Sequence, residues 1–258
     1  MSDPKPAPRL ASTVLLVRDR PGGIEVFMVE RHHQIDFATG ALVFPGGKVD
    51  PADADARLTA RCPESLAADE TARTLRIAAI RETFEECGVL LARTRGGESL
   101  VDSPKAGETF AELVERDDLL LACDCLLPFA HWITPAIVPK RFDTHFFMAA
   151  APEHQLALHD GHESVDSVWI TPRAALGAAE SGQRTVIYPT LMNLLRLAES
   201  RDVAGALAAA RRQPVVTVQP AITRRADGKA ELQIPGAAGY PTLPAALARF
   251  ATPEAPRR

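Results

Sequence analysis

The sequence has few of the features that mark secreted, membrane-spanning or nucleic-acid-binding proteins. Its 258 residues include only four scattered cysteines, too few for a disulfide-stapled fold. The N-terminal residues lack the apolar segment of a secretory signal. The longest apolar run, residues 119–130, includes Asp124 and Pro128 and is too short to span a bilayer. These absences favour a globular protein of a reducing compartment, and we expect a cytoplasmic location with no membrane partner.

Basic residues are also not in excess. Lysine and arginine total 29 and aspartate and glutamate total 33, which gives a formal net charge of −4. A mildly acidic chain has no overall attraction to nucleic acid phosphates. We therefore expect no nucleic-acid partner, and any anionic ligand must be held locally by a metal ion or a few placed cations.

The apolar pattern predicts strands and helices that alternate along the chain. Residues 13–17 and 24–29 flank a Pro-Gly-Gly turn and predict a hairpin. Residues 70–87 lack proline and glycine and carry apolar side chains at helical spacing, which predicts a helix ending at Gly88. Further strands are expected at 41–44, 126–134, 143–150 and 165–170, and further helices at 108–116, 172–180 and 188–199. This interleaving predicts an α/β or α+β protein with a mixed sheet.

The composition divides the chain into a tail, a main domain and an extension. Residues 1–9 are rich in proline and polar side chains, which predicts a flexible tail. Residues 10–204 are expected to form the main domain, with an insertion at about residues 54–73. Residues 205–258 are expected to add a hairpin, at 214–234, and a proline-rich end. This extension would either cover a sheet edge or form a dimer contact, so a homodimer stays open.

The helix predicted at residues 70–87 carries three glutamates on one face. Glu82, Glu85 and Glu86 are spaced i, i+3 and i+4, where each like-charge pair costs about 0.2–0.5 kcal/mol. A solvated acidic face is one reading of this pattern. A hard cation such as Mg²⁺ or Mn²⁺ would offset the repulsion, because it takes oxygen ligands from carboxylates and substrate phosphates. The preceding turn, Phe44–Gly47, favours a metal site, since its glycines let the backbone approach a ligand.

These residues resemble the sequence box of the Nudix (MutT-like) hydrolases. That box reads Gly, five residues, Glu, seven residues, then Arg-Glu-U-x-Glu-Glu-x-Gly-U, where U is aliphatic. Residues 81–89 match its second half except at Thr83, and Gly47 matches the opening glycine. Asp53 stands where the family has glutamate, and residues 54–80 separate it from Arg81, an insertion of 20 residues. The sequence therefore keeps the glycine and the three helix glutamates of the box, but a long insertion separates its two halves.

A box split by a long insertion is similar to that of the peroxisomal and mitochondrial acyl-coenzyme A diphosphatases. Residues 79–91, 131–135 and 141–147 fit the same branch. The resemblance implies an α/β/α sandwich with a mixed central sheet. It also implies hydrolysis of coenzyme A or acyl-coenzyme A to 3′,5′-ADP and (acyl-)phosphopantetheine. Two alternatives stay open: the same chemistry on ADP-ribose, NADH or another nucleoside diphosphate derivative, and a nucleotide-binding module without turnover.

The resemblance assigns roles to particular side chains. The implied ligands of Mg²⁺ or Mn²⁺ are Glu82, Glu85, Glu86 and the carbonyl of Gly47. The implied catalytic residues are Glu85, Glu86 and, from a later loop, Glu163, for which a solvated turn is the alternative. The candidate substrate-binding residues are Arg31, Gly46, Lys140 and Arg141. We expect Arg81 to point away from Glu85 and to form an ion pair that orients the helix.

Overall fold

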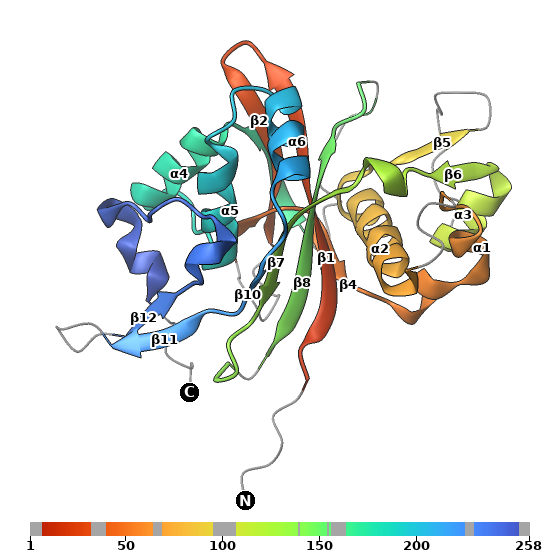
Figure 1. Ribbon diagram of the computed structural model, residues 1–258. Helices are drawn as coiled ribbons and strands as arrows, with labels where there is room; N and C mark the ends of the chain where they lie inside the picture. Colours follow the sequence, from red (N-terminus) through yellow and green to blue (C-terminus); the bar gives the residue numbers. More distant parts are fainter. Residues whose placement is uncertain are drawn as a thin grey trace, which may run out of the picture.

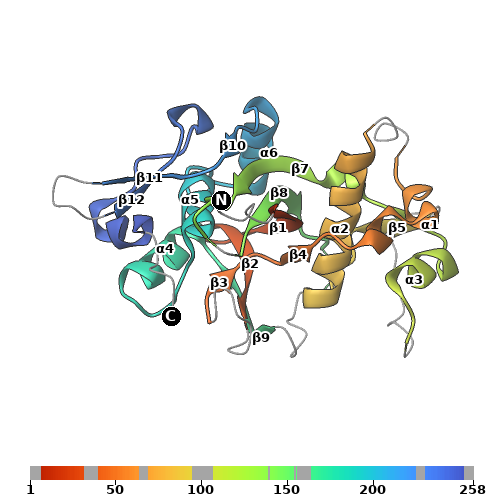
Figure 2. The same cartoon turned by 90° about the horizontal axis from the view of Figure 1, so that it is seen from below.

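A mixed sheet with helices on both faces forms the centre of the protein, seen in a computed structural model (Figures 1 and 2). The structure describes residues 7–31, 40–63, 69–94, 107–138, 140–153, 155, 164–224 and 230–252. One face of the sheet is covered by α2 and the small elements around it, and the other by α4, α5 and α6. This arrangement confirms the predicted α/β/α sandwich.

The sheet is built around the long strand β1. Its members are β1 (Arg9–Arg20), β2 (Gly23–Arg31), β3 (Leu42–Val43), β4 (Gly46–Lys48), β7 (Leu127–Ile133), β8 (Phe142–Ala150), β9 (Ser164–Ile170) and β10 (Thr217–Val218). The order is β10-β7-β8-β1-β2-β3, with β4 also paired to β1 and β9 to β2. The pairs β1–β8 and β7–β10 are parallel, and the others are antiparallel. The predicted hairpin and the four further predicted strands are confirmed, although β4 is not among the predicted strands.

Helix α2 (Glu70–Cys87) crosses one face of the sheet over β1 and β4, with the predicted bounds. The Asp69 side chain begins it by accepting a hydrogen bond from the Ala72 N–H, at 2.8 Å. Gly88 ends it in the left-handed conformation, with φ of 70°. Around α2 lie η1 (Pro51–Ala54), α1 (Ala56–Thr59), β5 (Ala92–Thr94), α3 (Phe110–Arg116), β6 (Leu119–Leu121) and η3 (Cys123–Cys125). Among these elements, the η1 turn contacts α2 beside the carboxylates that the helix carries.

The second face holds the C-terminal third of the chain. Its elements are α4 (Pro172–Glu180), α5 (Tyr188–Leu197), α6 (Val203–Arg212), β11 (Ala221–Arg224), β12 (Ala230–Gln233), η4 (Gly236–Ala238) and η5 (Ala245–Ala251). The predicted C-terminal hairpin is confirmed as β11 and β12, and β10 pairs with β7 to form one edge of the sheet. Helix α6 is not among the predicted helices, although Asp202 caps it by accepting from the Gly205 N–H at 2.7 Å. No helix in the described ranges is long and apolar enough to cross a bilayer.

Tyr240 ties the C-terminal segment to the sandwich. Its hydroxyl accepts a hydrogen bond from Trp132 Nε1 at 2.8 Å and donates one to Asn193 Oδ1 at 2.7 Å. Burial raises the pKa of Tyr240 to about 12, so the hydroxyl keeps its proton at neutral pH. The bonds join this segment to β7 and α5.

We expect Tyr240→Phe to lower the free energy of unfolding by about 1–3 kcal/mol, because it removes the partner of two buried polar groups. Urea unfolding followed by far-ultraviolet circular dichroism measures the change. A variant as stable as the original protein would show that the C-terminal segment does not depend on this contact.

Candidate active site

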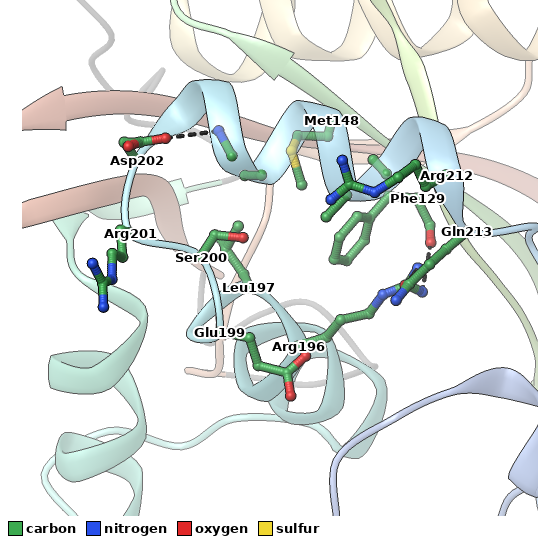
Figure 3. Close-up of a pocket in the computed structure, with 14 residues that line it drawn as sticks. Phe129, Met148, Arg196, Leu197, Glu199, Ser200, Arg201, Asp202, Arg212 and Gln213 are labelled. Atoms are coloured by element: carbon green, nitrogen blue, oxygen red, sulfur yellow. Dashed lines mark hydrogen bonds between the residues drawn. The ribbon is translucent and has the colours of Figure 1, made fainter.

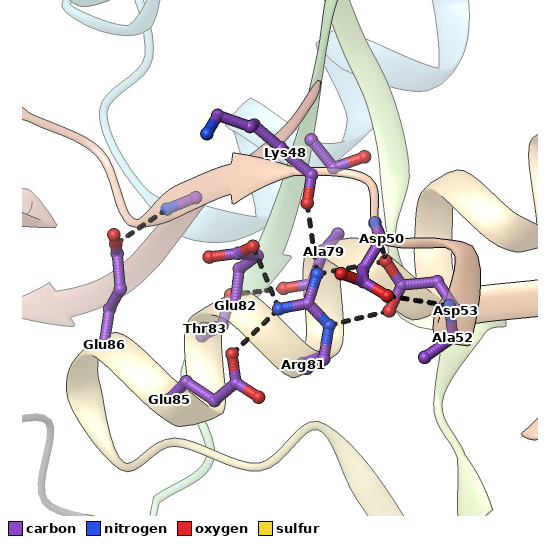
Figure 4. Close-up of polar contacts among 12 residues, drawn as sticks. Lys48, Asp50, Ala52, Asp53, Ala79, Arg81, Glu82, Thr83, Glu85 and Glu86 are labelled. Atoms are coloured by element: carbon purple, nitrogen blue, oxygen red, sulfur yellow. Dashed lines mark hydrogen bonds and ion pairs between the residues drawn. The ribbon is translucent and has the colours of Figure 1, made fainter. Parts of the chain in front are cut away.

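The carboxylates of α2 face the glycine turn that opens β4. In Figure 4, Glu82 and Glu86 point toward the strand that carries Lys48. The Gly46 N–H donates a hydrogen bond to Glu86 Oε2 at 2.9 Å, and the Glu86 residue is only 6% exposed. A backbone amide thus holds one buried carboxylate of the helix in place.

Gly46 and Gly47 are required for different reasons. A Cβ on Gly47 would lie 2.4 Å from Glu82 Oε2, so only glycine leaves room for that carboxylate beside the strand. Gly46 has a φ of 151°, and a Cβ there would lie 2.3 Å from the Ser12 carbonyl oxygen. The missing side chain is therefore required at Gly46 by the pairing with β1, and at Gly47 by the position of Glu82.

This difference predicts opposite effects of two matched alanine substitutions. Gly46→Ala is expected to destabilise the protein by about 1–3 kcal/mol through backbone strain, with about 1–3 kcal/mol more from overpacking. Gly47→Ala displaces only the flexible end of Glu82, so it should leave stability within about 1 kcal/mol and lower turnover about 100-fold. Urea unfolding and initial rates, measured on both variants, test the pair. The reverse order of effects would contradict these roles.

Arg81 joins the carboxylates of α2 to the segment that follows β4. Its Nη1 donates to Glu82 Oε1 at 2.9 Å and to Glu85 Oε2 at 2.8 Å, and its Nη2 to the Lys48 carbonyl at 3.1 Å. The expectation that Arg81 points away from Glu85 is therefore wrong, because residues four apart share a helix face. Burial alone would lower the pKa of Arg81, but the hydrogen bond to Asp53 and the nearby carboxylates raise it above its ordinary value.

Asp53 completes this arrangement from the other side. Its carboxylate is fully buried and accepts from Arg81 Nε at 2.7 Å and from Arg81 Nη2 at 3.0 Å. Its Oδ2 also accepts from the Asp50 N–H at 2.7 Å. Asp53, the residue that departs from the Nudix box, thus forms a bidentate ion pair with Arg81 (Figure 4). This pair fixes α2 against the turn that leads into the insertion.

The donor atoms around β4 fit a hard divalent cation. Glu82, Glu85 and Glu86 offer only oxygen atoms, the ligand type that Mg²⁺ and Mn²⁺ prefer. The Glu85 side chain is 50% exposed and faces solvent, whereas that of Glu82 is 13% exposed. The space at Gly47 that a Cβ would fill lets the carboxylate of Glu82 meet the strand backbone. The residues therefore suit a metal ion that also contacts a substrate from the Glu85 side.

The other predicted site residues are not all gathered here. Arg141 precedes β8, and its Nε donates to the Thr134 carbonyl at 3.3 Å. Gly47 and His145 both pair with Ser12, on opposite sides of β1. Arg141, next to Lys140, is four residues before His145, so it lies about 13 Å along the strands from Gly47 and two strands away. Glu163 lies outside the described residues, and only the backbone of Arg31 is described, at the end of β2.

A separate cavity of about 380 Å³ opens between α5 and α6, on the sheet face opposite α2 (Figure 3). Arg196 enters it from α5, but its guanidinium donates to the Phe129 carbonyl at 3.0 Å and to Gln213. The guanidinium of Arg196 is thus hydrogen-bonded to other residues of the protein and is not oriented toward a ligand in the cavity. We place the candidate reaction at β4 and α2, where the carboxylates are.

Comparisons with known proteins identify the family of this chain. The family described as the NUDT19 Nudix domain matches residues 62–197. A crystal structure of a Nudix hydrolase from Alicyclobacillus acidocaldarius has a TM-score of 0.69 and 27% identity, and the match covers 78% of this chain and 96% of that one. That structure therefore shares the arrangement of most of the described chain.

Curated relatives carry the same kind of name. A Caenorhabditis elegans protein named as a nudix hydrolase is 30% identical over 183 residues, 69% of this chain and 57% of its own. The acyl-coenzyme A diphosphatase NUDT19 of Homo sapiens is 27% identical, over 68% of this chain and 61% of its own. This chain thus spans about three fifths of the length of these two relatives. Because the family model matches more than half of the chain, we conclude that this protein belongs to the Nudix hydrolase family, with a domain of the NUDT19 type.

Proposed function

We propose that this protein is a metal-dependent diphosphatase that hydrolyses the pyrophosphate of coenzyme A or acyl-coenzyme A. The products would be 3′,5′-ADP and (acyl-)phosphopantetheine. The observation that carries the proposal is the cluster of Glu82, Glu85 and Glu86, fixed at Gly46 and Gly47 and clamped by Arg81. The name of the human and other relatives, acyl-coenzyme A diphosphatase, supports the choice of substrate.

The three carboxylates differ in exposure, and this difference suggests different roles. Glu86 is buried and bonded to the Gly46 amide, and Glu82 is packed against Gly47, so both suit a fixed metal ligand. Glu85 is half exposed and can meet both the metal and the incoming water. Mg²⁺ or Mn²⁺ bound here would neutralise the pyrophosphate and favour ionisation of a bound water. Glu163 stays a second candidate for the base that accepts the proton from that water.

The ion pair of Arg81 with Asp53 has a positioning role. It holds the end of α2 that carries the carboxylates at a fixed distance from β4, so that the ligands need little rearrangement. Arg81 also lowers the repulsion among Glu82 and Glu85 when no cation is bound. The candidate substrate contacts at Arg31, Gly46, Lys140 and Arg141 remain part of the proposal, as does a cytoplasmic location.

Product analysis by chromatography tests the proposal. The purified chain with Mg²⁺ or Mn²⁺ is incubated with coenzyme A, acyl-coenzyme A esters, ADP-ribose and NADH, with Glu85→Gln as the control. We expect 3′,5′-ADP from the coenzyme A compounds and its loss in the control. Cleavage of only ADP-ribose or NADH would keep the chemistry and overturn the substrate. No cleavage of any compound would favour a nucleotide-binding module without turnover.

A further inference from the structure

A second group of ligand side chains lies on strands β7 and β8. His131 of β7 is directly opposite His145 of β8, and Asp143 is two residues before His145, on the same side of the strand. Among the described residues, these three form the group whose possible ligand atoms all lie within 4.8 Å of one another. The register of the two strands therefore brings two imidazoles and a carboxylate together.

The two histidines present nitrogen atoms to one carboxylate oxygen. Asp143 Oδ1 lies 2.5 Å from His131 Nε2 and 3.6 Å from His145 Nε2. The imidazole rings are stacked, with centroids 4.0 Å apart and an angle of 20° between the ring planes. All three side chains are only partly exposed, at 16%, 23% and 29% for His131, Asp143 and His145. The ligand atoms of the three residues therefore lie close together at a partly exposed position.

Neighbouring residues fix the orientation that a metal ligand requires. His131 Nδ1 is hydrogen-bonded to Thr217 Oγ1 of β10 at 2.8 Å, which leaves Nε2 as the nitrogen directed at the group. The guanidinium of Arg76, on α2, lies over the Phe147 ring and donates a hydrogen bond to the Ala72 carbonyl at 2.9 Å.

This group is separate from the α2 carboxylates. Gly47 and His145 pair with opposite sides of Ser12, so their Cα atoms are about 10 Å apart. The Ser12 hydroxyl donates to the Leu75 carbonyl at 2.7 Å, which places the first half of α2 over the strand between them. The two groups also differ in chemistry, because nitrogen ligands favour Zn²⁺, Co²⁺ or Ni²⁺ and an all-oxygen set favours Mg²⁺ or Mn²⁺.

We propose that His131, Asp143 and His145 form a second metal site, which binds a transition-metal ion such as Zn²⁺. Two imidazoles and one carboxylate supply three ligands of a tetrahedral site, and water supplies the fourth. The ion would connect β7 with β8, and Thr217 of β10 would orient its ligand His131. We expect it to stabilise this edge of the sheet and the C-terminal segment that β10 begins. The proposal does not depend on the reaction proposed for the α2 carboxylates.

Metal titration of the full chain, stripped with a chelator and dialysed, tests the proposal. With Mg²⁺ in excess to occupy the α2 carboxylates, Zn²⁺ is titrated by calorimetry and Co²⁺ by visible absorption. The titrations use the unsubstituted chain and the variants His145→Asn, Thr217→Val and Glu85→Gln. We expect one ion per chain, a tetrahedral cobalt spectrum without a thiolate band, and a higher melting temperature with Zn²⁺. His145→Asn should abolish this binding, Thr217→Val should weaken it about 10- to 100-fold, and Glu85→Gln should leave it unchanged.

Three results would overturn the second site. One is binding that survives in His145→Asn, and another is binding that is lost only in Glu85→Gln, which would place the ion on α2. The third is a strong thiolate band with Co²⁺, which would place the ion on cysteines. Circular dichroism and the melting temperature of the metal-free variants show whether each one is folded, and Thr217→Val serves as the test if His145→Asn does not fold.

Discussion

Replacing Asp53 by alanine is expected to lower the free energy of unfolding by about 3–5 kcal/mol, the cost of breaking a buried ion pair by removing one partner. Asp53 is fully buried, and the Arg81 side chain that it binds is only 12% exposed. Removing the carboxylate also leaves the Asp50 N–H without the oxygen that accepts its hydrogen bond at 2.7 Å. Arg81 keeps its contacts with Glu82 and Glu85, so the chain is expected to remain folded at low temperature.

Two control variants separate the ion pair from the turn that carries it. Asp50→Ala removes the exposed cap of the same 3₁₀ turn and should cost only about 1 kcal/mol. Asp53→Glu introduces the residue of the Nudix box and should cost about 1–3 kcal/mol, because a fully buried position has to rearrange to accept another methylene. Urea unfolding of all three variants is the measurement. Equal stability of Asp53→Ala and Asp50→Ala would contradict the role of the ion pair.

Glu85→Gln is expected to reduce turnover about 10²- to 10⁴-fold, the range for loss of a group that takes part in proton transfer. The substitution keeps the size of the side chain and removes its charge at the half-exposed end of the cluster. Its contact with Arg81 is an exposed i,i+4 pair, so the free energy of unfolding should change by less than about 0.5 kcal/mol. Activity and stability should therefore separate in this variant.

Glu70→Gln is the matched control. It makes the same change on the same helix, at the exposed first turn and about 18 Å along the helix axis from Glu82. Initial rates at saturating substrate, with urea unfolding of both variants, give the comparison. Equal rates for Glu85→Gln and the original protein would contradict a catalytic role for Glu85, and equal losses in the two variants would indicate a general effect of charge.

The sequence alone is sufficient to predict most of the fold, because its strongest signals are local. Helix α2 has its predicted bounds, since Asp69, a run without proline and glycine, and Gly88 all mark them within the chain. The strand β4 is not predicted, because Gly46 and Gly47 have low strand propensity and pair with β1 through the backbone. Helix α6 is also not predicted, although Asp202 and an alanine-rich run are visible in the sequence. Local signals are thus available for α6 but not for β4.

The sequence predicts that the three glutamates of the candidate site share a helix face, but it does not predict the contacts that support them. The spacing of Glu82, Glu85 and Glu86 is enough to place them on one face of a helix. The pairing of Arg81 with Asp53 joins residues separated by the insertion, so only the folded loop reveals its geometry. The group of His131, Asp143 and His145 depends on the register of β7 and β8, which the sequence does not determine. Long-range pairing is therefore the information that the sequence lacks.

The central claim is that the α2 carboxylates perform a metal-dependent hydrolysis. The most direct measurement is the initial rate of 3′,5′-ADP release from coenzyme A, first in excess chelator and then during titration with Mg²⁺. We predict no release in chelator, a rate that rises to saturation with Mg²⁺, and a Glu85→Gln variant that never approaches the original rate. Full release in the presence of chelator, or an unchanged Mg²⁺ titration of Glu85→Gln, would contradict the claim.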